Sequence, residues 1–214
     1  MGRSINQQRK ISDDRVRKPR KTKKTIIIAA EGKNKTESIY FNNFDDGKKN
    51  YSIIMANGNA TDPVNLVKML STEIIKRGLD MNEGDLAFCV FDTDIDSIKN
   101  RAIKEAKKLA DKNRIIIITS SPCFELWFLL HYKYTTAKLS NDEVITNLKK
   151  YLSNYEKNKN VFPIIKENIS NAIQNAKKLE KYQQDNGRDI NLVEANPHSE
   201  VYKIIEELER ISSN

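Results

Sequence analysis

The chain has 214 residues, of which 38% are hydrophobic and 31% are charged, and its formal net charge is +8. This length allows one α/β domain with a sizeable core, or such a domain with a small helical extension. Apolar runs such as 115–118 and 126–130 are far shorter than the roughly 20 residues that cross a bilayer. The basic beginning of the chain also lacks the apolar stretch of a secretory signal. We therefore expect a cytoplasmic protein with no contact to a membrane.

The basic excess is confined to the first 24 residues. They contain ten Lys or Arg and two Asp, while the other 190 residues carry 27 basic and 27 acidic side chains. Because this segment has few large apolar residues to bury, we expect a tail that is disordered when free. The tail either contacts nucleic-acid phosphates without regard to sequence, or serves as a solubilising arm or a link to an acidic partner. The candidates for phosphate contact are Arg15, Arg17, Lys18, Arg20, Lys21, Lys23 and Lys24.

The chain after the tail alternates between short apolar runs and amphipathic segments. The apolar runs at 25–30, 51–56, 85–91 and 114–119 predict strands, and the segments at 35–44, 64–77 and 97–112 predict helices. Asp62 is the expected N-cap of the second helix, Pro63 its first residue and Gly78 its C-cap. Ser121 and Pro122 are the expected cap and first position of a further helix that ends near residue 132.

Strands that alternate with helices of this length predict an α/β fold with a Rossmann-like, mostly parallel, four-stranded sheet flanked by helices. Beyond residue 133 strand signals nearly vanish, and the charged segments 142–157, 162–184 and 200–212 predict three helices. We expect a basic tail at 1–24, an α/β core at 25–135 and a helical extension at 136–214 that packs on the core, so that 25–214 forms one globular unit. Cys89 and Cys123 lie in apolar segments without metal-ligand spacing, which predicts buried, reduced thiols.

Acidic residues follow two of the predicted strands. Glu31-Gly32 follows the first, and Asp92, Asp94 and Asp96 follow the third on one side of an extended chain. The carboxyl ends of strands in an open α/β sheet converge, and function is concentrated there. Neighbouring carboxylates repel one another, and Mg²⁺ or Mn²⁺ offsets this repulsion through the hard oxygen ligands that it prefers. Glu31 would then be free to act as a general acid or base.

Each acidic motif also has a structural interpretation. Most Glu-Gly pairs after a strand are turns, and Asp96 has the position of a cap for the helix that begins near residue 97. The aspartates do not form a calcium loop, because no glycine and terminal glutamate follow at the required offsets. The pairing of Glu31 with Asp92 and Asp94 on neighbouring strand ends is more specific than either motif alone.

The order of these motifs resembles that of Toprim domains, which occur in topoisomerases, primases and OLD-type nucleases. In more detail the chain resembles the RloB family over about residues 25–212. The segments that carry the resemblance are Glu31-Gly32 with Thr36-Glu37-Ser38-Ile39-Tyr40, Phe91-Asp92-Thr93-Asp94, the stretch 121–131, and Asn196-Pro197-His198-Ser199-Glu200-Val201-Tyr202. His198 stands where the family usually has serine.

This resemblance implies a Toprim-like fold and Mg²⁺-dependent nuclease activity in bacterial anti-phage or abortive-infection systems. Such proteins are often encoded beside an ATPase that controls them, which implies a separate ATPase partner. Carried over by position, Glu31 is the acid or base and Asp92 and Asp94 are the metal ligands. Asp96 lies beyond this pair and is a further candidate ligand.

Four further residues belong to the matching segments. Glu37 has two interpretations. It either belongs to the site, where it binds a second metal ion or holds the metal ligands in place, or it is a solvated charge on its helix. Glu125 lies in the first turn of its helix, where the helix dipole favours an acid regardless of function. It also lies near the end of the fourth strand and faces the proposed site, so it is a second candidate, with Glu37, to bind a second metal ion or to support the ligands. Trp127 is expected in the core. His131 lies about 120° from Glu125 around the helix, so it is expected to interact with the C-terminal dipole instead of sharing a ligand with Glu125.

We therefore expect phosphodiester hydrolysis in RNA, with tRNA one candidate, or in DNA. The alternative is a non-catalytic subunit that senses a phosphate ligand or docks on an ATPase. Nucleotidyl transfer is a third possibility, although no nucleotide-binding module is visible. The sequence leaves open the substrate, the trigger, the number of metal ions and whether the protein forms a homo-oligomer.

Overall fold

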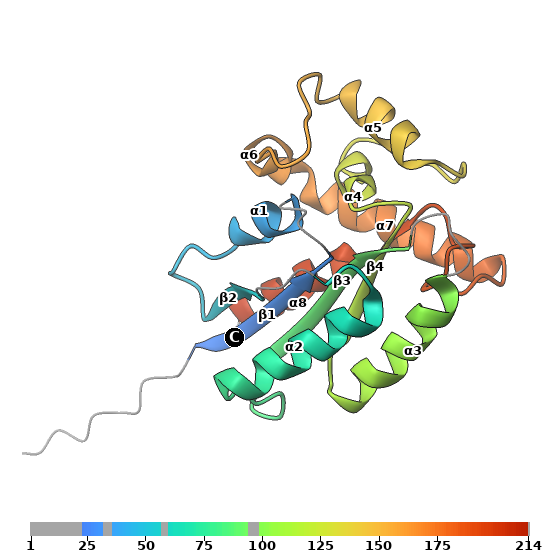
Figure 1. Ribbon diagram of the computed structural model, residues 1–214. Coiled ribbons are helices and arrows are strands. Elements are labelled where there is room, and N and C mark those ends of the chain that lie inside the picture. The colour runs from blue at the N-terminus through green and yellow to red at the C-terminus, as the bar shows by residue number, and fades with distance from the viewer. Residues whose placement is uncertain (1–22, 32–35, 57–59, 94–98, 214) are drawn as a thin grey trace, which may run out of the picture.

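The computed structural model describes residues 23–31, 36–56, 60–93 and 99–213, and all structural statements concern these residues. Its centre is a five-stranded sheet with the order β2-β1-β3-β4-β5 (Figure 1). The first four strands are parallel and the fifth is antiparallel to β4. The strands are β1 (Lys24–Ala30), β2 (Tyr51–Met55), β3 (Leu86–Asp92), β4 (Ile116–Ser121) and β5 (His198–Ser199).

The predicted α/β fold with a mostly parallel sheet is confirmed, with two differences. The sheet has a fifth strand, which the sequence conceals because β5 has only two residues and pairs with a strand far away in the chain. The fourth strand was predicted from residue 114 but begins at Ile116. Arg114 has a φ of 54°, a left-handed conformation that does not fit a strand.

Three helices connect the parallel strands: α1 (Thr36–Asn42), α2 (Pro63–Arg77) and α3 (Lys99–Lys112). The caps predicted for α2 are confirmed. The carboxylate of Asp62 accepts a hydrogen bond from the backbone N–H of Asn65, and Pro63 is the first helical residue. Gly78 ends the helix with a φ of 64°, which glycine adopts without a steric penalty.

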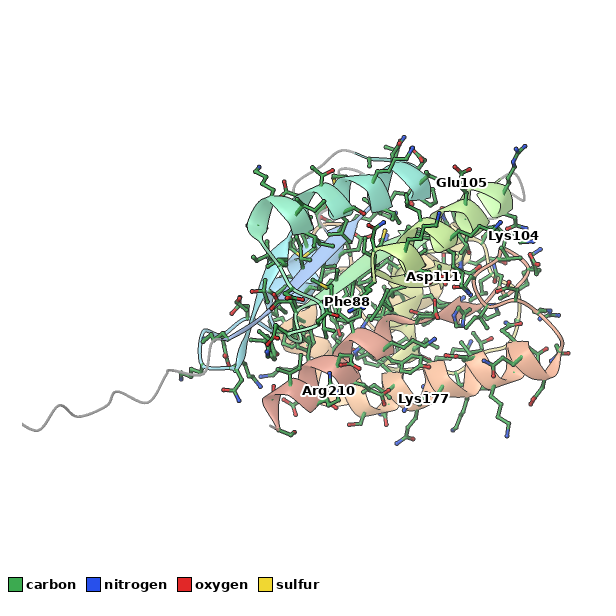
Figure 2. The ribbon with its side chains drawn as sticks, turned by 90° about the horizontal axis from the view of Figure 1, so that it is seen from below. Phe88, Lys104, Glu105, Asp111, Lys177 and Arg210 are labelled. Atoms are coloured by element: carbon green, nitrogen blue, oxygen red, sulfur yellow. The ribbon has the colours of Figure 1, made fainter. Side chains whose placement is uncertain are left out.

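The sheet is covered on both faces because alternate residues of its central strands point to opposite sides. Ile27, Ala29, Cys89 and other residues pack against α2 and α3 in one core. Ile26, Ile28 and Phe88 belong to a second and larger core on the other face. Figure 2 shows α3, with Lys104 and Glu105, on one side of Phe88, and the C-terminal helices with Lys177 and Arg210 on the other.

The short helix α4 (Glu125–Leu130) follows β4 and is buried along its whole length. The prediction that Ser121 caps this helix and Pro122 begins it is wrong. Ser121 is the last residue of β4, and Phe124 is the N-cap residue, without a side-chain cap. The capping signal is overridden because Ser121 takes part in the sheet and pairs with His198 of β5.

The C-terminal part is helical, as predicted, but its segments are shorter. The predicted helix 142–157 ends at residue 149, and the predicted helix 162–184 is divided into three pieces. Ser140 begins the first of these helices with a capping box, in which it exchanges hydrogen bonds with Glu143. The elements are α5 (Asn141–Lys149), α6 (Phe162–Ile165), the 3-10 turn η1 (Lys166–Asn168), α7 (Ile169–Asp185) and α8 (Val201–Ser212).

Segment 196–200 attaches the C-terminal part to the sheet. The side chain of Asn196 accepts a hydrogen bond from the N–H of Leu139 at 2.9 Å and donates one to the Leu139 carbonyl at 2.8 Å. The hydroxyls of Ser199 and Ser120 are 3.0 Å apart between the paired strands. The predicted helical extension therefore also supplies a strand of the sheet.

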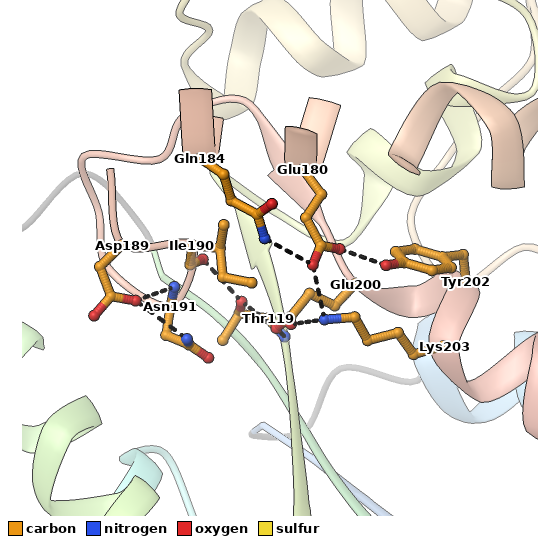
Figure 3. Close-up of polar contacts among 9 residues, drawn as sticks. All are labelled: Thr119, Glu180, Gln184, Asp189, Ile190, Asn191, Glu200, Tyr202 and Lys203. Atoms are coloured by element: carbon orange, nitrogen blue, oxygen red, sulfur yellow. Dashed lines mark hydrogen bonds and ion pairs between the residues drawn. The ribbon is translucent and has the colours of Figure 1, made fainter. Parts of the chain in front are cut away.

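Glu200 makes the most extensive of these contacts (Figure 3). Its carboxylate, which is buried, accepts hydrogen bonds from the backbone N–H of Thr119 at 3.0 Å and from the Thr119 hydroxyl at 2.8 Å. Its other oxygen pairs with Lys203 at 2.6 Å. Lys203 also pairs with Glu180, which accepts a hydrogen bond from the hydroxyl of Tyr202. A carboxylate buried at the sheet edge is thus fully partnered, as burial of a charge requires.

The two cysteines are buried and free, as predicted. Trp127 is fully buried in the larger core, also as predicted. Among the described residues, no helix combines the length and the apolar character needed to cross a membrane.

Replacement of Glu200 by alanine tests the importance of the closing segment. We expect the free energy of unfolding to fall by about 3 kcal/mol, because the buried Thr119 N–H loses its charged acceptor and Lys203 loses a partner. Urea denaturation measures this change. Glu209→Ala, at an exposed position of the same helix, is the matched control and should change stability by less than about 0.5 kcal/mol. Equal losses in the two variants would show that the Glu200 contacts do not stabilise the fold.

Candidate active site

Acidic residues from two neighbouring strands meet at the carboxyl edge of the sheet. Glu31 directly follows β1, and Asp92 is the last residue of β3, which pairs with β1. Both side chains are partly buried. The chain after Asp92 stays attached to β4, because the N–H of Thr93 donates to the Ser120 carbonyl at 2.9 Å. The structure therefore places the predicted acid or base and one predicted metal ligand at the same sheet edge.

Glu37 lies in the first turn of α1, and its side chain is buried. Burial raises the pKa of Glu37 to about 7, and the negative charges of Glu125 and Glu31 add to this rise, while its own backbone N–H and Lys157 oppose it. One of its carboxylate oxygens, Oε2, has no hydrogen-bond partner among the described residues. The interpretation of Glu37 as a solvated helix charge is therefore wrong, and Glu37 belongs to the acidic cluster.

Glu125 begins α4 and is also buried, with two partners from a distant segment. Its Oε1 atom accepts a hydrogen bond from the Tyr155 hydroxyl at 3.2 Å and lies 3.6 Å from Nζ of Lys157. Burial and the nearby Glu125 charge raise the pKa of Tyr155, so its hydroxyl keeps the proton that it donates. The expected first-turn position of Glu125 is confirmed, but its partners are specific side chains in addition to the helix dipole.

Electrostatic effects on neighbouring groups connect the four carboxylates. Burial raises the pKa of Cys123, and the charges of Glu125 and Asp92 raise it further. Partial burial lowers the pKa of Lys157, but Glu125 and Asp92 outweigh burial and the pKa is raised overall. Because Glu31 and Glu125 both act on Glu37, the carboxylates Glu31, Glu37, Asp92 and Glu125 form one acidic cluster with Lys157 beside it.

The segment that supplies Tyr155 and Lys157 is held against α1. Asn158, next to Lys157, donates from its backbone N–H to the hydroxyl of Thr36 at 3.3 Å. Asn158 has a φ of 67°, a left-handed conformation that asparagine tolerates better than most residues, and it turns the segment back towards α6. Lys157 is thereby placed beside Glu125 although 32 residues separate them in the chain.

Comparison with known proteins adds one finding. A family of RloB-like proteins matches residues 26–208, which is most of the chain. The chain belongs to the RloB-like family. No curated protein and no solved structure matches it significantly. The resemblance that the motifs indicated is therefore confirmed at the level of the family.

Several of the predicted site residues of this RloB-like protein lie outside the described residues. They are Asp94 and Asp96, together with Arg15, Arg17, Lys18, Arg20 and Lys21 of the tail. Lys23 and Lys24 are described, and they lie at the start of the folded unit: Lys24 begins β1, and the two ammonium groups donate to the carbonyls of Gly47 and Glu83. Among the described residues, no group of three or more His, Cys, Asp or Glu side chains is arranged to hold a metal ion.

The two histidines of the protein lie in its core. His131 is the C-cap residue of α4, and its Nδ1 lies 2.9 Å from the Trp127 carbonyl, which can only accept, so Nδ1 carries the proton. Burial lowers the pKa of His131 to about 4 despite this bond and one to the Phe128 carbonyl. The predicted place at the helix end is confirmed, and the ring contacts the negative end of the helix dipole through the Trp127 carbonyl, although it is neutral near pH 7.

His198 is fully buried in β5, and neither ring nitrogen has a hydrogen-bond partner among the described residues. Burial lowers its pKa, and Lys203 adds to this effect, while Glu200 and Glu180 act in the opposite direction without outweighing it. The histidine at the position where the family usually has serine is thus a neutral residue of the core.

Tyr155 and Lys157 are the residues that sequence analysis missed. Both lie in a stretch that was predicted as the end of a helix, and their contact with Glu125 joins segments about 30 residues apart. The local signal was the three asparagines, two tyrosines and one serine among the ten residues 151–160, because these residue types are weak helix formers.

The buried histidines generate a prediction on pH. Because the folded protein keeps both rings neutral, the unfolded chain takes up their protons first as the pH falls below about 6.5. The contribution of His131 to stability is therefore lost as the pH falls from about 6.5 towards about 4. NMR of the histidine ring protons should show neither ring titrating near pH 6.5. The control is the same protein unfolded in denaturant, in which both rings should titrate near pH 6.5. A ring that titrates near pH 6.5 in the folded protein would contradict its burial.

Proposed function

We propose that this RloB-like protein hydrolyses phosphodiester bonds in nucleic acid with the help of a divalent cation, Mg²⁺ or Mn²⁺. The observation that carries the proposal is the convergence of Glu31, Glu37, Asp92 and Glu125 at the carboxyl edge of the sheet. Two of these carboxylates are almost completely buried, which costs free energy in the absence of a compensating positive charge. Lys157 supplies a positive charge beside Glu125.

The four acidic side chains have the chemistry that a hard cation prefers, but no three of them are arranged as a ligand set among the described residues, so the proposed ligand set includes Asp94, which lies outside them. All four acidic side chains offer carboxylate oxygens, which Mg²⁺ and Mn²⁺ prefer, and the unpartnered Oε2 of Glu37 is a buried acceptor without a donor. Asp92 and, by the sequence motif, Asp94 would hold the cation, with Asp96 a further candidate. Glu37 and Glu125 would hold a second ion or orient the ligands. When bound, a divalent cation polarises a phosphoryl oxygen and lowers the pKa of a coordinated water.

The side chains supply the remaining requirements of the reaction. Glu31, at the end of β1, would accept or donate a proton at the reacting oxygen. Lys157 is a positive group beside the cluster that would stabilise the negative charge that develops on the phosphate. Tyr155 holds the carboxylate of Glu125 in place, so the acidic cluster keeps its arrangement when substrate enters.

The proposal that the substrate is a nucleic acid comes from the family resemblance. We propose RNA, with tRNA as one candidate, or DNA as the substrate, and a role as an effector in bacterial anti-phage defence. A separately encoded ATPase would control the activity. The body of the chain is electrically neutral, so binding of a polyanion at an acidic site depends on the cation and on local groups of lysine and arginine.

A non-catalytic role is the alternative. In that case the cluster would sense a phosphate ligand, or the protein would dock on an ATPase, and Glu31 would have no proton to transfer. Cleavage assays of the purified full chain on labelled RNA and DNA, with Mg²⁺, with Mn²⁺ and with chelator, separate the two roles. Absence of cleavage under every metal and partner condition would refute the enzymatic proposal.

We predict that Asp92→Asn abolishes metal-dependent cleavage and leaves the fold intact. The amide keeps the size of the carboxylate and removes one negative charge beside its acidic neighbours, so the fold should survive the substitution. Cleavage rate and thermal unfolding measure the two effects. Glu105→Gln, on the exposed side of α3 (Figure 2), is the control and should cleave at the normal rate. Normal cleavage by the Asp92 variant would place the metal centre elsewhere.

We predict that Glu31→Gln binds cation and nucleic acid almost normally but cleaves at least about 100-fold more slowly, as expected for loss of a general acid or base. Glutamine keeps the size of the side chain but cannot exchange the proton. Single-turnover cleavage and Mn²⁺ titration measure the two properties separately. Loss of Mn²⁺ affinity would identify Glu31 as a ligand, and full activity would make it a structural turn residue.

A further inference from the structure

A positively charged segment borders the acidic cluster. Residues 149–161, between α5 and α6, contain four lysines and one glutamate, whereas the chain from residue 25 onwards is neutral as a whole. Lys157 of this segment contacts Glu125, so the segment reaches the cluster directly. The lysines further from the cluster are exposed, and the bridge from Lys159 to Glu156 at 3.0 Å is a surface pair of little strength.

An exposed aromatic ring lies in the same segment. Tyr151 stacks on Tyr132 with the ring centroids 5.0 Å apart and the planes inclined by 4°. Tyr151 nevertheless remains 46% exposed. Because Tyr132 covers one face and fixes the ring, the exposed area of Tyr151 forms a preorganised aromatic surface, which lowers the entropic cost of stacking another ring on it.

The surface beside Tyr151 is hollowed. A depression of about 340 Å³ is lined by residues that include Tyr151, Asn154, Tyr155, Lys159, Asn160 and Ile164. Its lining combines aromatic and apolar groups with amides and one ammonium group. Tyr155 lines the depression and also donates to Glu125, so one buried side chain lies between the depression and the acidic cluster.

These features fit one kind of occupant. Lysines beside an exposed aromatic ring bind a nucleic-acid strand, in which phosphates meet the cations and a base stacks on the ring. The bases of a duplex are stacked on one another and do not offer their faces. We infer that Tyr151 and the lysines of segment 149–161 bind an unpaired stretch of nucleic acid and lead it to the acidic cluster. The claim that this stretch is the substrate rests on the proposed function, whereas the claim of binding does not.

Each contact has a defined role in this arrangement. Lys149, Lys150 and Lys159 neutralise phosphates, and Tyr151 stacks on a base without selecting its identity, since every base has a π-face. Lysine does not distinguish ribose from deoxyribose, so RNA and DNA single strands should both bind. This surface is therefore specific for unpaired segments and does not select a base sequence.

The first test compares Tyr151→Ala with Tyr151→Phe. Fluorescence anisotropy of labelled single-stranded RNA, single-stranded DNA and a blunt duplex is measured on the full chain with EDTA, so that no strand is cut. We expect Tyr151→Ala to bind single strands roughly 5- to 150-fold more weakly, the equivalent of one stacked base, and Tyr151→Phe to bind normally. Wild-type affinity of Tyr151→Ala, or an equal loss for the duplex, would overturn the inference.

A second measurement addresses the lysines. Lys149→Ala with Lys150→Ala should reduce the slope of log affinity against log salt by about 0.7 for each phosphate that the variant no longer neutralises. Lys107→Ala with Lys108→Ala, an adjacent exposed pair on α3, removes the same charge from another surface and should leave the slope unchanged. Equal reductions in both pairs would mean that only total charge matters, which contradicts a defined path.

A stacking signal distinguishes this surface from a protein-docking site. A 2-aminopurine base in the single strand should lose fluorescence on binding to the wild type and to Tyr151→Phe, but not to Tyr151→Ala. No quenching with the wild type would refute base stacking on Tyr151. Cleavage is measured separately: single-strand binding that depends on Tyr151 without any cleavage would preserve the binding surface and refute the proposed nuclease. Cleavage that is unaffected by Tyr151→Ala would preserve the nuclease and refute the path.

Discussion

The contact between Glu200 and Thr119 positions the edge of the sheet on which the candidate site depends. Glu200 holds the backbone and the side chain of Thr119, and the next residue, Ser120, accepts the hydrogen bond of Thr93 directly after Asp92. The end of β4 then leads into α4, whose first residue is Glu125. Asp92 and Glu125 are therefore both set by the position of one strand, and that strand is held by a carboxylate from the C-terminal part.

The acidic cluster stores electrostatic free energy in the metal-free protein. Burial of Glu37 and the charges of its acidic neighbours oppose its ionisation, while Lys157 is placed to relieve part of the cost. A cation at the cluster would remove the repulsion, so its binding free energy would also stabilise the fold. Lys157 would at the same time be released from its role as counter-charge and become available to a phosphate.

Local patterns predicted the parts of the fold that local interactions determine. The caps Asp62 and Gly78, the alternation of strands and helices, and the placement of Glu31 and Asp92 at strand ends followed from residues near in the chain. Strand β5 did not, because its two residues are strand only through their pairing with β4. The same long-range pairing made the predicted cap at Ser121 fail. Glu37 was identified but its burial was not, since the segment that contributes Tyr155 and Lys157 lies far along the chain.

The antiparallel strand β5 has a consequence for the order in which the protein can form. Thr119 and Glu200 are 81 residues apart, so on the ribosome the outer side of β4 cannot pair with β5 until residues 198–200 have been synthesised. Pairings across such long loops are slow to form and cannot be replaced by local contacts. In a nascent chain, β1, β3 and the start of α4 are therefore synthesised well before the pairing of β4 with β5 can fix their arrangement. This order would delay assembly of the acidic cluster until the segment that contains Glu200 has been synthesised.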